Sequence, residues 1–215
     1  MIIAGTGHRP KNFGGLTDPH ELMPAIQVLM EWLLDLAGGE PCEVVVGMAE
    51  GFDLMLAWAA LMLAKQGHPF TVTAALPWPE FCDRIRHARA KSWAGQVLLR
   101  ARESGHVHEV VKAKPAKIQD PRTGRPVEDS KQINRILYQR NVWMVNRLQL
   151  RAQPSNMLLA CWDGVQDQRS GTLNTMRYAW RTFGHRPMNC WDYVAAALGI
   201  KHRVPEASKD YAGFL

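Results

Sequence analysis

The stretch from Ser170 to Thr175 combines a glycine with hydroxyl side chains at a predicted helix start. An apolar run at 156–162, typical of a buried strand, precedes it. A strand, a loop of small residues and a helix start form a place for a phosphate, because free backbone N–H groups and the helix dipole favour an anion. Gly171 allows close approach of the backbone, and Ser170, Thr172 and Thr175 carry hydroxyls that can donate hydrogen bonds. The alternative is that Ser170 or Thr172 is only a helix N-cap.

Two other predicted strands also end in polar loops that contain glycine. The strand at 1–5 leads into a loop of candidate ligand-binding residues, namely Gly5, Thr6, Gly7, His8 and Arg9. This loop contains GxG without a third glycine at the dinucleotide spacing, so the Rossmann fingerprint is not met. The strand at 43–47 leads into a second loop that contributes the candidates Gly47, Met48, Glu50 and Asp53. Asp53 is either an N-cap or an acceptor, for example for a ribose hydroxyl.

A helix predicted at 132–149 carries a cation on its apolar side. At about 100° per residue, one apolar stripe forms from Ile133, Ile136, Leu137, Met144 and Leu148. Arg140 lies in the middle of this stripe, and a guanidinium is rarely buried without a partner. Three interpretations remain open: Arg140 pairs with an internal carboxylate, its stem reaches outward to solvent, or it points toward an anion at the edge of the sheet. Asn141 lies at the edge of the stripe, and Asp163 follows the strand at 156–162.

Strands and helices alternate along the chain. Strands are predicted at 1–5, 43–47, 70–76, 106–111 and 156–162, with helices between them, among them one from about 80 to 102. This order predicts an α/β fold, Rossmann-like and doubly wound, with a mainly parallel sheet and helices on both faces. Ligands bind at the carboxyl ends of such strands. The three polar strand ends are therefore expected to meet at one nucleotide or phosphate site.

The remaining segments are less regular. Residues 112–131 are rich in Lys, Arg and Pro and predict a protruding loop or hairpin, which is a lid, a nucleic-acid contact or a solvated excursion. A basic group at 84–91 is either a solvated face or a source of cations for an anionic ligand. A short edge strand at 188–191 and a brief helix at 192–198 are expected before a tail at 201–215 that docks or frays. We divide the chain into a domain at 1–184 and a C-terminal extension at 185–215.

Composition limits the classes of partner. The 215 residues carry a formal net charge of +6, which favours anionic partners. The four cysteines are far apart and form no CxxC, which predicts a reduced, cytoplasmic protein. No secretory signal and no apolar run of roughly 18 residues is present, so no membrane partner is expected. His106 and His108 could suggest a metal site, but no third ligand follows at a recognisable spacing, so neither a metal nor a cofactor is expected.

These motifs together resemble the SLOG superfamily, the Rossmann-like group that includes the DNA-processing protein A fold, YpsA-like proteins and the "lonely guy" phosphoribohydrolases. The matching segments cover about residues 1–184 in the family order, and they are 5–10, 47–53, 140–145, 162–164 and 171–175. The pattern is closest to YpsA-like proteins, many of which occur in phages and bacteria. The resemblance implies a pocket for a nucleotide or nucleotide-derived ligand, with its phosphate on the loop of Gly171 and Thr172. It also implies a homodimer.

Catalytic relatives use a helix arginine, which Arg140 matches, and a glutamate after the phosphate loop. Asn174 and Thr175 stand where that glutamate is expected, and neither supplies a carboxylate. Glu50 on the facing loop is the candidate substitute. Three hypotheses follow: a module that senses or sequesters a nucleotide-like molecule, an enzyme that cleaves the N-glycosidic bond of a nucleoside monophosphate through Arg140 and Glu50, and a protein that binds single-stranded DNA. The absence of aromatic residues between the basic residues of 112–131 makes DNA the less favoured partner.

Overall fold

A parallel sheet forms the centre of the computed structural model, which describes residues 1–120, 122–123, 125–164 and 171–200. Within these ranges six strands pair in the order β4-β3-β2-β1-β7-β8, and every pair is parallel. The strands are β1 (Ile2–Gly7), β2 (Cys42–Val46), β3 (Phe70–Leu76), β4 (Val107–Glu109), β7 (Met157–Cys161) and β8 (Met188–Asn189). The chain builds outward from β1 to β4, and then β7 returns to the other side of β1. This reversal makes the sheet doubly wound, as predicted.

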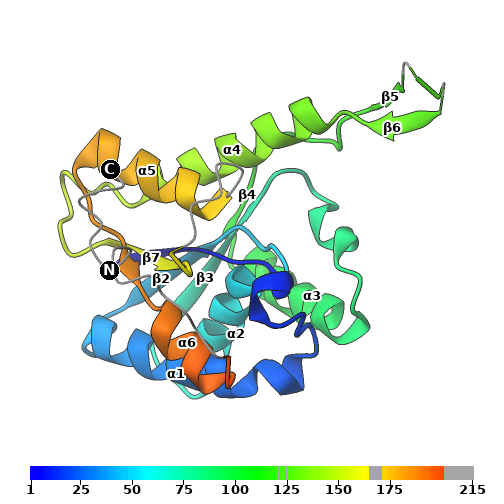
Figure 1. The fold of residues 1–215 in the computed structure, drawn as a ribbon. Coiled ribbons are helices and arrows are strands. Elements are labelled where there is room, and N and C mark those ends of the chain that lie inside the picture. Colours follow the sequence, from blue (N-terminus) through cyan, green and yellow to red (C-terminus); the bar gives the residue numbers. More distant parts are fainter. Residues whose placement is uncertain (121, 124, 165–170, 201–215) are drawn as a thin grey trace.

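Helices cover both faces of the sheet (Figure 1). One face carries α1 (Pro19–Ala37), α2 (Phe52–Lys65), α3 (Ala88–Glu103) and α6 (Trp191–Ala197). The other face carries α4 (Ser130–Arg147) and α5 (Gly171–Phe183). Nearly every residue of α2 is buried, because this helix lies between the sheet and its neighbours α1 and α3. The α/β, Rossmann-like architecture predicted from the sequence is therefore present.

Glycines in β1 allow α2 to pack closely on the sheet. A Cβ at Gly5 would collide with the side chain of Leu56, and a Cβ at Gly7 would collide with Phe52. Both residues belong to α2. These two glycines therefore serve contact between a helix and a strand, a role that glycine commonly has in α/β proteins.

The predicted helix at 80–102 is wrong in its first part. A 3-10 helix, η2 (Phe81–Arg84), is followed by residues with extended backbone at Ile85 and His87, and α3 begins only at Ala88. Ile85 is 6% exposed and belongs to the main hydrophobic core. Burial of this side chain outweighs continuation of the helix. Between β1 and α1, a 3-10 helix, η1 (Pro10–Phe13), buries Phe13 completely.

The basic insert at 112–131 contains a hairpin, which is one of the two shapes predicted for it. Strands β5 (Lys117–Gln119) and β6 (Pro126–Glu128) pair antiparallel, and Figure 1 shows them projecting from the body beyond the start of α4. All three residues of β5 are exposed. At the other end of the chain, β8 pairs with β7, and α6 packs against α1. The predicted tail at 201–215 lies outside the described residues.

None of the helices in the described part of the chain has the length and apolar character needed to cross a membrane.

Candidate functional site

A cavity of about 780 Å³ opens at the carboxyl ends of β1 and β7, where the order of the strands reverses. Switch points of this kind are the usual ligand sites of doubly wound sheets. The residues that line it come from all three polar strand ends and from α4. They are Thr6, Gly7, His8, Arg9, Lys11, Asn12, Ala49, Asp53, Asn134, Leu137, Tyr138, Arg140, Asn141, Asp163, Gly171, Thr172 and Asn174.

Arg140 lies in the wall of this cavity and is only 7% exposed. Its Nη1 donates to the carbonyl oxygen of Gly47 at 2.7 Å, and its Nε and Nη2 donate to Oδ1 of Asn141 at 3.0 and 2.7 Å. A guanidinium has five N–H donors. Within the described residues three of them have partners, so two remain for a ligand. The side chain of Arg140 therefore does not reach outward to solvent. It places a buried positive charge and two N–H groups without a partner among the described residues at the cavity.

The carboxylate of Asp53 lies beside Arg140, and both groups approach the Cα of Gly47 from the side that a Cβ would occupy. A Cβ built on Gly47 would lie 2.5 Å from Cζ of Arg140 and 2.7 Å from Oδ2 of Asp53. Burial raises the pKa of Asp53, and the charge of Arg140 opposes this rise. Burial also lowers the pKa of Arg140, and Asp53 opposes that fall. The internal carboxylate predicted as one possible partner of Arg140 is therefore Asp53, which interacts with the guanidinium through its charge.

Asp53 does not cap α2. The N-cap residue is Gly51, and Asp53 lies inside the first turn. Its Oδ2 accepts a hydrogen bond from the backbone N–H of Ala49 at 3.4 Å. Because Asp53 also lines the cavity, its carboxylate is placed to accept a hydroxyl from a ligand.

The loop between β2 and α2 has unusual backbone geometry. Met48 has a φ of +57° although it is not glycine, and its side chain is fully buried. Gly51 has a φ of +104°, and a Cβ there would lie 2.5 Å from the carbonyl oxygen of His8. That same oxygen accepts the N–H of Phe52 at 3.1 Å. Strained backbone of this kind concentrates at functional sites, and here it presses the second strand-end loop against the first.

The first and third strand ends are joined through His8 and Asp163. Nε2 of His8 lies 2.8 Å from the backbone N of Asp163 and 2.9 Å from its Oδ1. Asn12 donates to Oδ2 of the same carboxylate at 3.1 Å. The ring of His8 packs edge-on against Trp191 at 5.3 Å, and Trp191 stacks on Phe13 at 5.5 Å. The residues after 184 therefore help to hold one wall of the cavity.

The start of α5 forms the opposite wall. Thr172 is 5% exposed and lines the cavity. Nδ2 of Asn141 lies 4.0 Å from the position of a Cβ on Gly171, so the amide faces the start of this helix. Thr175 lies one turn further on, where its hydroxyl donates to the carbonyl oxygen of Gly171 at 2.8 Å. Ser170 lies outside the described residues.

Most of the residues predicted from the sequence come together at this cavity, and a few lie elsewhere. Gly5, Gly47 and Thr175 do not line it, and Met48 and Glu50 line a neighbouring cavity. Seven lining residues were not among the predicted site residues, namely Lys11, Asn12, Ala49, Asn134, Leu137, Tyr138 and Asn174. Asn134 and Tyr138 precede Asn141 by seven and three residues on the same helix, so helical periodicity from Asn141 would have indicated both.

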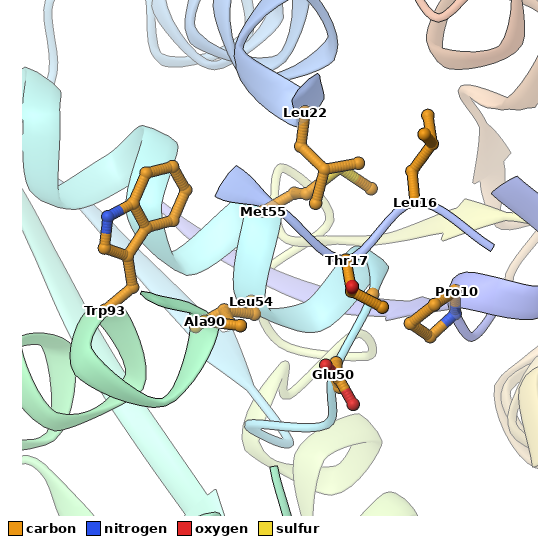
Figure 2. A pocket seen from close by; sticks show the side chains of 10 residues that line it. Pro10, Leu16, Thr17, Leu22, Glu50, Leu54, Met55, Ala90 and Trp93 are labelled. Atoms are coloured by element: carbon orange, nitrogen blue, oxygen red, sulfur yellow. The ribbon is translucent and has the colours of Figure 1, made fainter. Parts of the chain in front are cut away.

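The neighbouring cavity has a volume of about 550 Å³ and shares Arg9, Asn134 and Leu137 with the first. Glu50 lines it, and Oε1 of Glu50 is buried without a hydrogen-bond partner among the described residues. Glu50 also borders a small apolar pocket that reaches to Leu22 and Trp93 (Figure 2). That pocket has a volume of only about 10 Å³, so it is a packing defect and not a ligand site.

The predicted basic group at 84–91 is largely paired with acidic residues. Arg84 contacts Glu128 at 3.2 Å, Arg89 contacts Asp18 at 2.7 Å, and Lys91 contacts Asp83 at 3.2 Å. Exposed pairs of this kind contribute little stability. They do reduce the positive charge that this surface offers to an anion. In the described part of the chain, no three His, Cys, Asp or Glu side chains gather as a metal site would require.

Comparison with known proteins finds a solved structure with a similar fold. No family model matches the chain. No curated protein matches it either. Among solved structures it is similar to the X-ray structure of DNA processing protein A (DprA) from Streptococcus pneumoniae, at 15% sequence identity and a TM-score of 0.48. The similarity covers 96% of this chain but 59% of DprA, so the chain spans about three fifths of that protein's length. A likeness at this level does not transfer an activity from one protein to the other.

Proposed function

We propose that the chain binds a nucleotide or nucleotide-derived ligand at the carboxyl edge of its sheet, as a sensing or sequestering module. One observation carries the proposal: the buried Arg140 faces a cavity with two N–H donors to spare. A buried cation is costly unless it is paired, and a guanidinium fork matches the geometry of a phosphate. The hydroxyl of Thr172 and the start of α5 lie on the same cavity and supply further donors.

The remaining polar groups fit the other parts of a nucleotide. Asp53 is the acceptor proposed for a ribose hydroxyl, since it lines the cavity and carries a carboxylate, whose hydrogen bond from the N–H of Ala49 is long at 3.4 Å. Asp163 is held by His8 and Asn12 and offers a second fixed carboxylate. This pattern of one cation, hydroxyl donors and carboxylate acceptors is that of a nucleotide site and not of an apolar ligand pocket.

Binding is favoured over cleavage of an N-glycosidic bond. The two residues proposed for that reaction, Arg140 and Glu50, line different cavities. Glycosidic hydrolysis needs a carboxylate close to the sugar carbon that reacts. The hydrolase alternative predicts release of free base from nucleoside monophosphates, and loss of that release in Glu50→Ala.

Nucleic acid is the less favoured partner because acidic residues pair with much of the basic surface. Lys114 of the insert contacts Glu128 at 2.6 Å, and Arg84 contacts the same carboxylate at 3.2 Å. Binding of single-stranded DNA through the remaining cations would weaken steeply with salt. From the resemblance to the SLOG superfamily we also propose that the chain is a member of that group and forms a homodimer.

Calorimetric titration with nucleoside mono- and diphosphates tests the proposal. Arg140→Lys keeps the positive charge but loses the planar fork, so affinity is expected to fall about tenfold or more. Arg135→Lys, at an exposed position of the same helix, is the matched control and is expected to change affinity less than about twofold. The proposal fails if no nucleotide binds, or if both variants bind equally well.

A further inference from the structure

The second cavity is continuous with the proposed phosphate site. Arg9, Asn134 and Leu137 belong to the walls of both. Phe81 lines the second cavity, and the centroid of its ring lies 5.9 Å from Cζ of Arg140 in the first. A ring packed near Phe81 and an anion held by Arg140 would therefore be neighbours, as the base and the phosphate of one nucleotide are.

One loop serves both cavities. Ala49 and Asp53 line the first, whereas Met48 and Glu50 line the second. The positive φ of Met48 turns the chain between them. A nucleotide whose ribose contacts Asp53 in the first cavity would therefore lie close to Glu50 in the wall of the second cavity.

The second cavity has the character of a base pocket. Five apolar residues form one part of its wall, namely Met48, Phe81, Ile85, Ile133 and Leu137, and polar or charged residues form the rest. A nucleobase has apolar faces and a polar edge, so it fits a pocket with apolar walls and a few hydrogen-bonding groups.

In the wall of the second cavity, Glu50 is a hydrogen-bond acceptor that lacks a donor among the described residues. Its Oε1 is buried without a hydrogen-bond partner, and within the described residues no cation lies within 4.0 Å of its carboxylate. The other carboxylate of this cavity, Glu128, is paired with Arg84 and Lys114. A carboxylate only accepts hydrogen bonds, and a buried acceptor without a donor is costly. A ligand that brings donors to Glu50 removes that cost.

We propose that the second cavity holds the base of the nucleotide and that Glu50 selects guanine, an inference that rests on the proposed function. The edge of guanine presents two adjacent donors, the ring N1–H and the 2-amino group, which match the two oxygens of a carboxylate. Hypoxanthine keeps only the N1–H. Adenine places a ring nitrogen acceptor beside its amino group, and this acceptor faces the negative carboxylate. The expected order of affinity is therefore GMP, then IMP, then AMP.

Titration of the full chain with GMP, IMP and AMP tests this order. Each lost hydrogen bond to a charged acceptor is expected to cost about tenfold in affinity. Glu50→Gln replaces one acceptor oxygen by a donor, so it is expected to abolish the preference for GMP over AMP. Glu128→Gln is the matched control in the same cavity and is expected to keep that preference. Thermal unfolding is the check that both variants are folded, as is expected because Oε1 of Glu50 has no hydrogen-bond partner among the described residues.

The outcomes separate the two proposals. If none of these three and no other nucleoside mono- or diphosphate binds, the proposed function fails, and the choice of base fails with it. If only other nucleotides bind, the choice of base fails alone. If the wild type binds AMP as tightly as GMP, or if Glu50→Gln keeps the preference for GMP, then Glu50 does not read the base, while nucleotide binding itself stands. Loss of the preference in Glu50→Gln alone supports the inference.

Discussion

The Nη1 atom of Arg140 donates a 2.7 Å hydrogen bond to the carbonyl oxygen of Gly47, a residue 93 positions earlier in the chain. This bond ties the helix that faces the cavity to the end of the second strand. It also brings the guanidinium near Asp53, whose carboxylate lies on the same side of Gly47. The position of the proposed phosphate-binding cation therefore depends on a residue without a side chain.

Gly47→Ala is expected to displace Arg140. The added Cβ would lie 2.5 Å from both Cζ and Nη1 of the guanidinium, so the side chain must move or the loop must shift. Overpacking of this kind costs about 1–3 kcal/mol of unfolding free energy. Urea denaturation measures the loss, and calorimetry should show weaker nucleotide binding. Gly95→Ala, in α3 with open space at its Cβ position, is the control, and an equal loss there would contradict the explanation.

Asn156→Ala is expected to destabilise the fold by about 2–4 kcal/mol. The buried amide accepts the N–H of Ile2 at 2.7 Å and donates to the carbonyl of Leu148 at 2.7 Å, so it connects β1 to the end of α4. Removing it leaves two backbone groups without partners. Asn146→Ala, which removes an exposed contact with Tyr178, is expected to cost less than about 0.5 kcal/mol. Similar losses in both variants, measured by urea denaturation, would refute the assignment.

Trp191→Ala is expected to lower both stability and nucleotide affinity. Its ring is 3% exposed and contacts His8 and Phe13, so its removal costs about 3–5 kcal/mol and loosens the loop after β1. Trp191→Phe should keep most of the affinity because an aromatic ring remains. Tyr193→Ala on the same helix, where Tyr193 is 56% exposed, is the control for a general effect on α6. Unchanged affinity in Trp191→Ala would show that this helix does not support the site.

The free energy of unfolding is expected to decrease at acidic pH because of His185. Burial lowers the pKa of this half-buried imidazole below 6.5, and its Nε2 accepts the N–H of Leu158 at 3.2 Å. The unfolded chain therefore binds a proton at a higher pH than the folded chain does. The stability that the neutral ring contributes is fully present above about pH 6.5 and is lost as pH falls through the lower pKa of the folded state. His185→Gln should flatten this part of a curve of unfolding free energy against pH, and an unaltered curve would exclude His185 as its source.

The fold could be predicted because its signals are local. Strands β1, β2, β3 and β7 are short, mainly apolar runs, and α1 begins after the N-cap Asp18 and ends at Gly38. The break between η2 and α3 could not be predicted in this way, since residues 81–87 contain neither glycine nor proline. Only the burial of Ile85 in the assembled core explains it.

The site could be predicted in part for a similar reason. The helical stripe indicated that Arg140 is buried, but its contacts with Gly47 and Asp53 join distant parts of the chain and carry no local signal. The glycine at position 5 was interpreted as an approach point for a ligand, whereas the structure places it against Leu56. Nothing in the residue type distinguishes these two uses of glycine.

The central claim, that a nucleotide phosphate binds between Arg140 and the start of α5, is tested most directly by comparing Thr172→Val with Thr175→Val. Both substitutions remove a buried hydroxyl from α5, but only Thr172 lines the cavity, because the hydroxyl of Thr175 is used by Gly171. With AMP and GMP titrated in parallel, Thr172→Val is expected to weaken binding about tenfold. Thr175→Val should lower thermal stability while it changes affinity less than about twofold. Equal affinities in the wild type and Thr172→Val, or equal losses in the two variants, would contradict the claim.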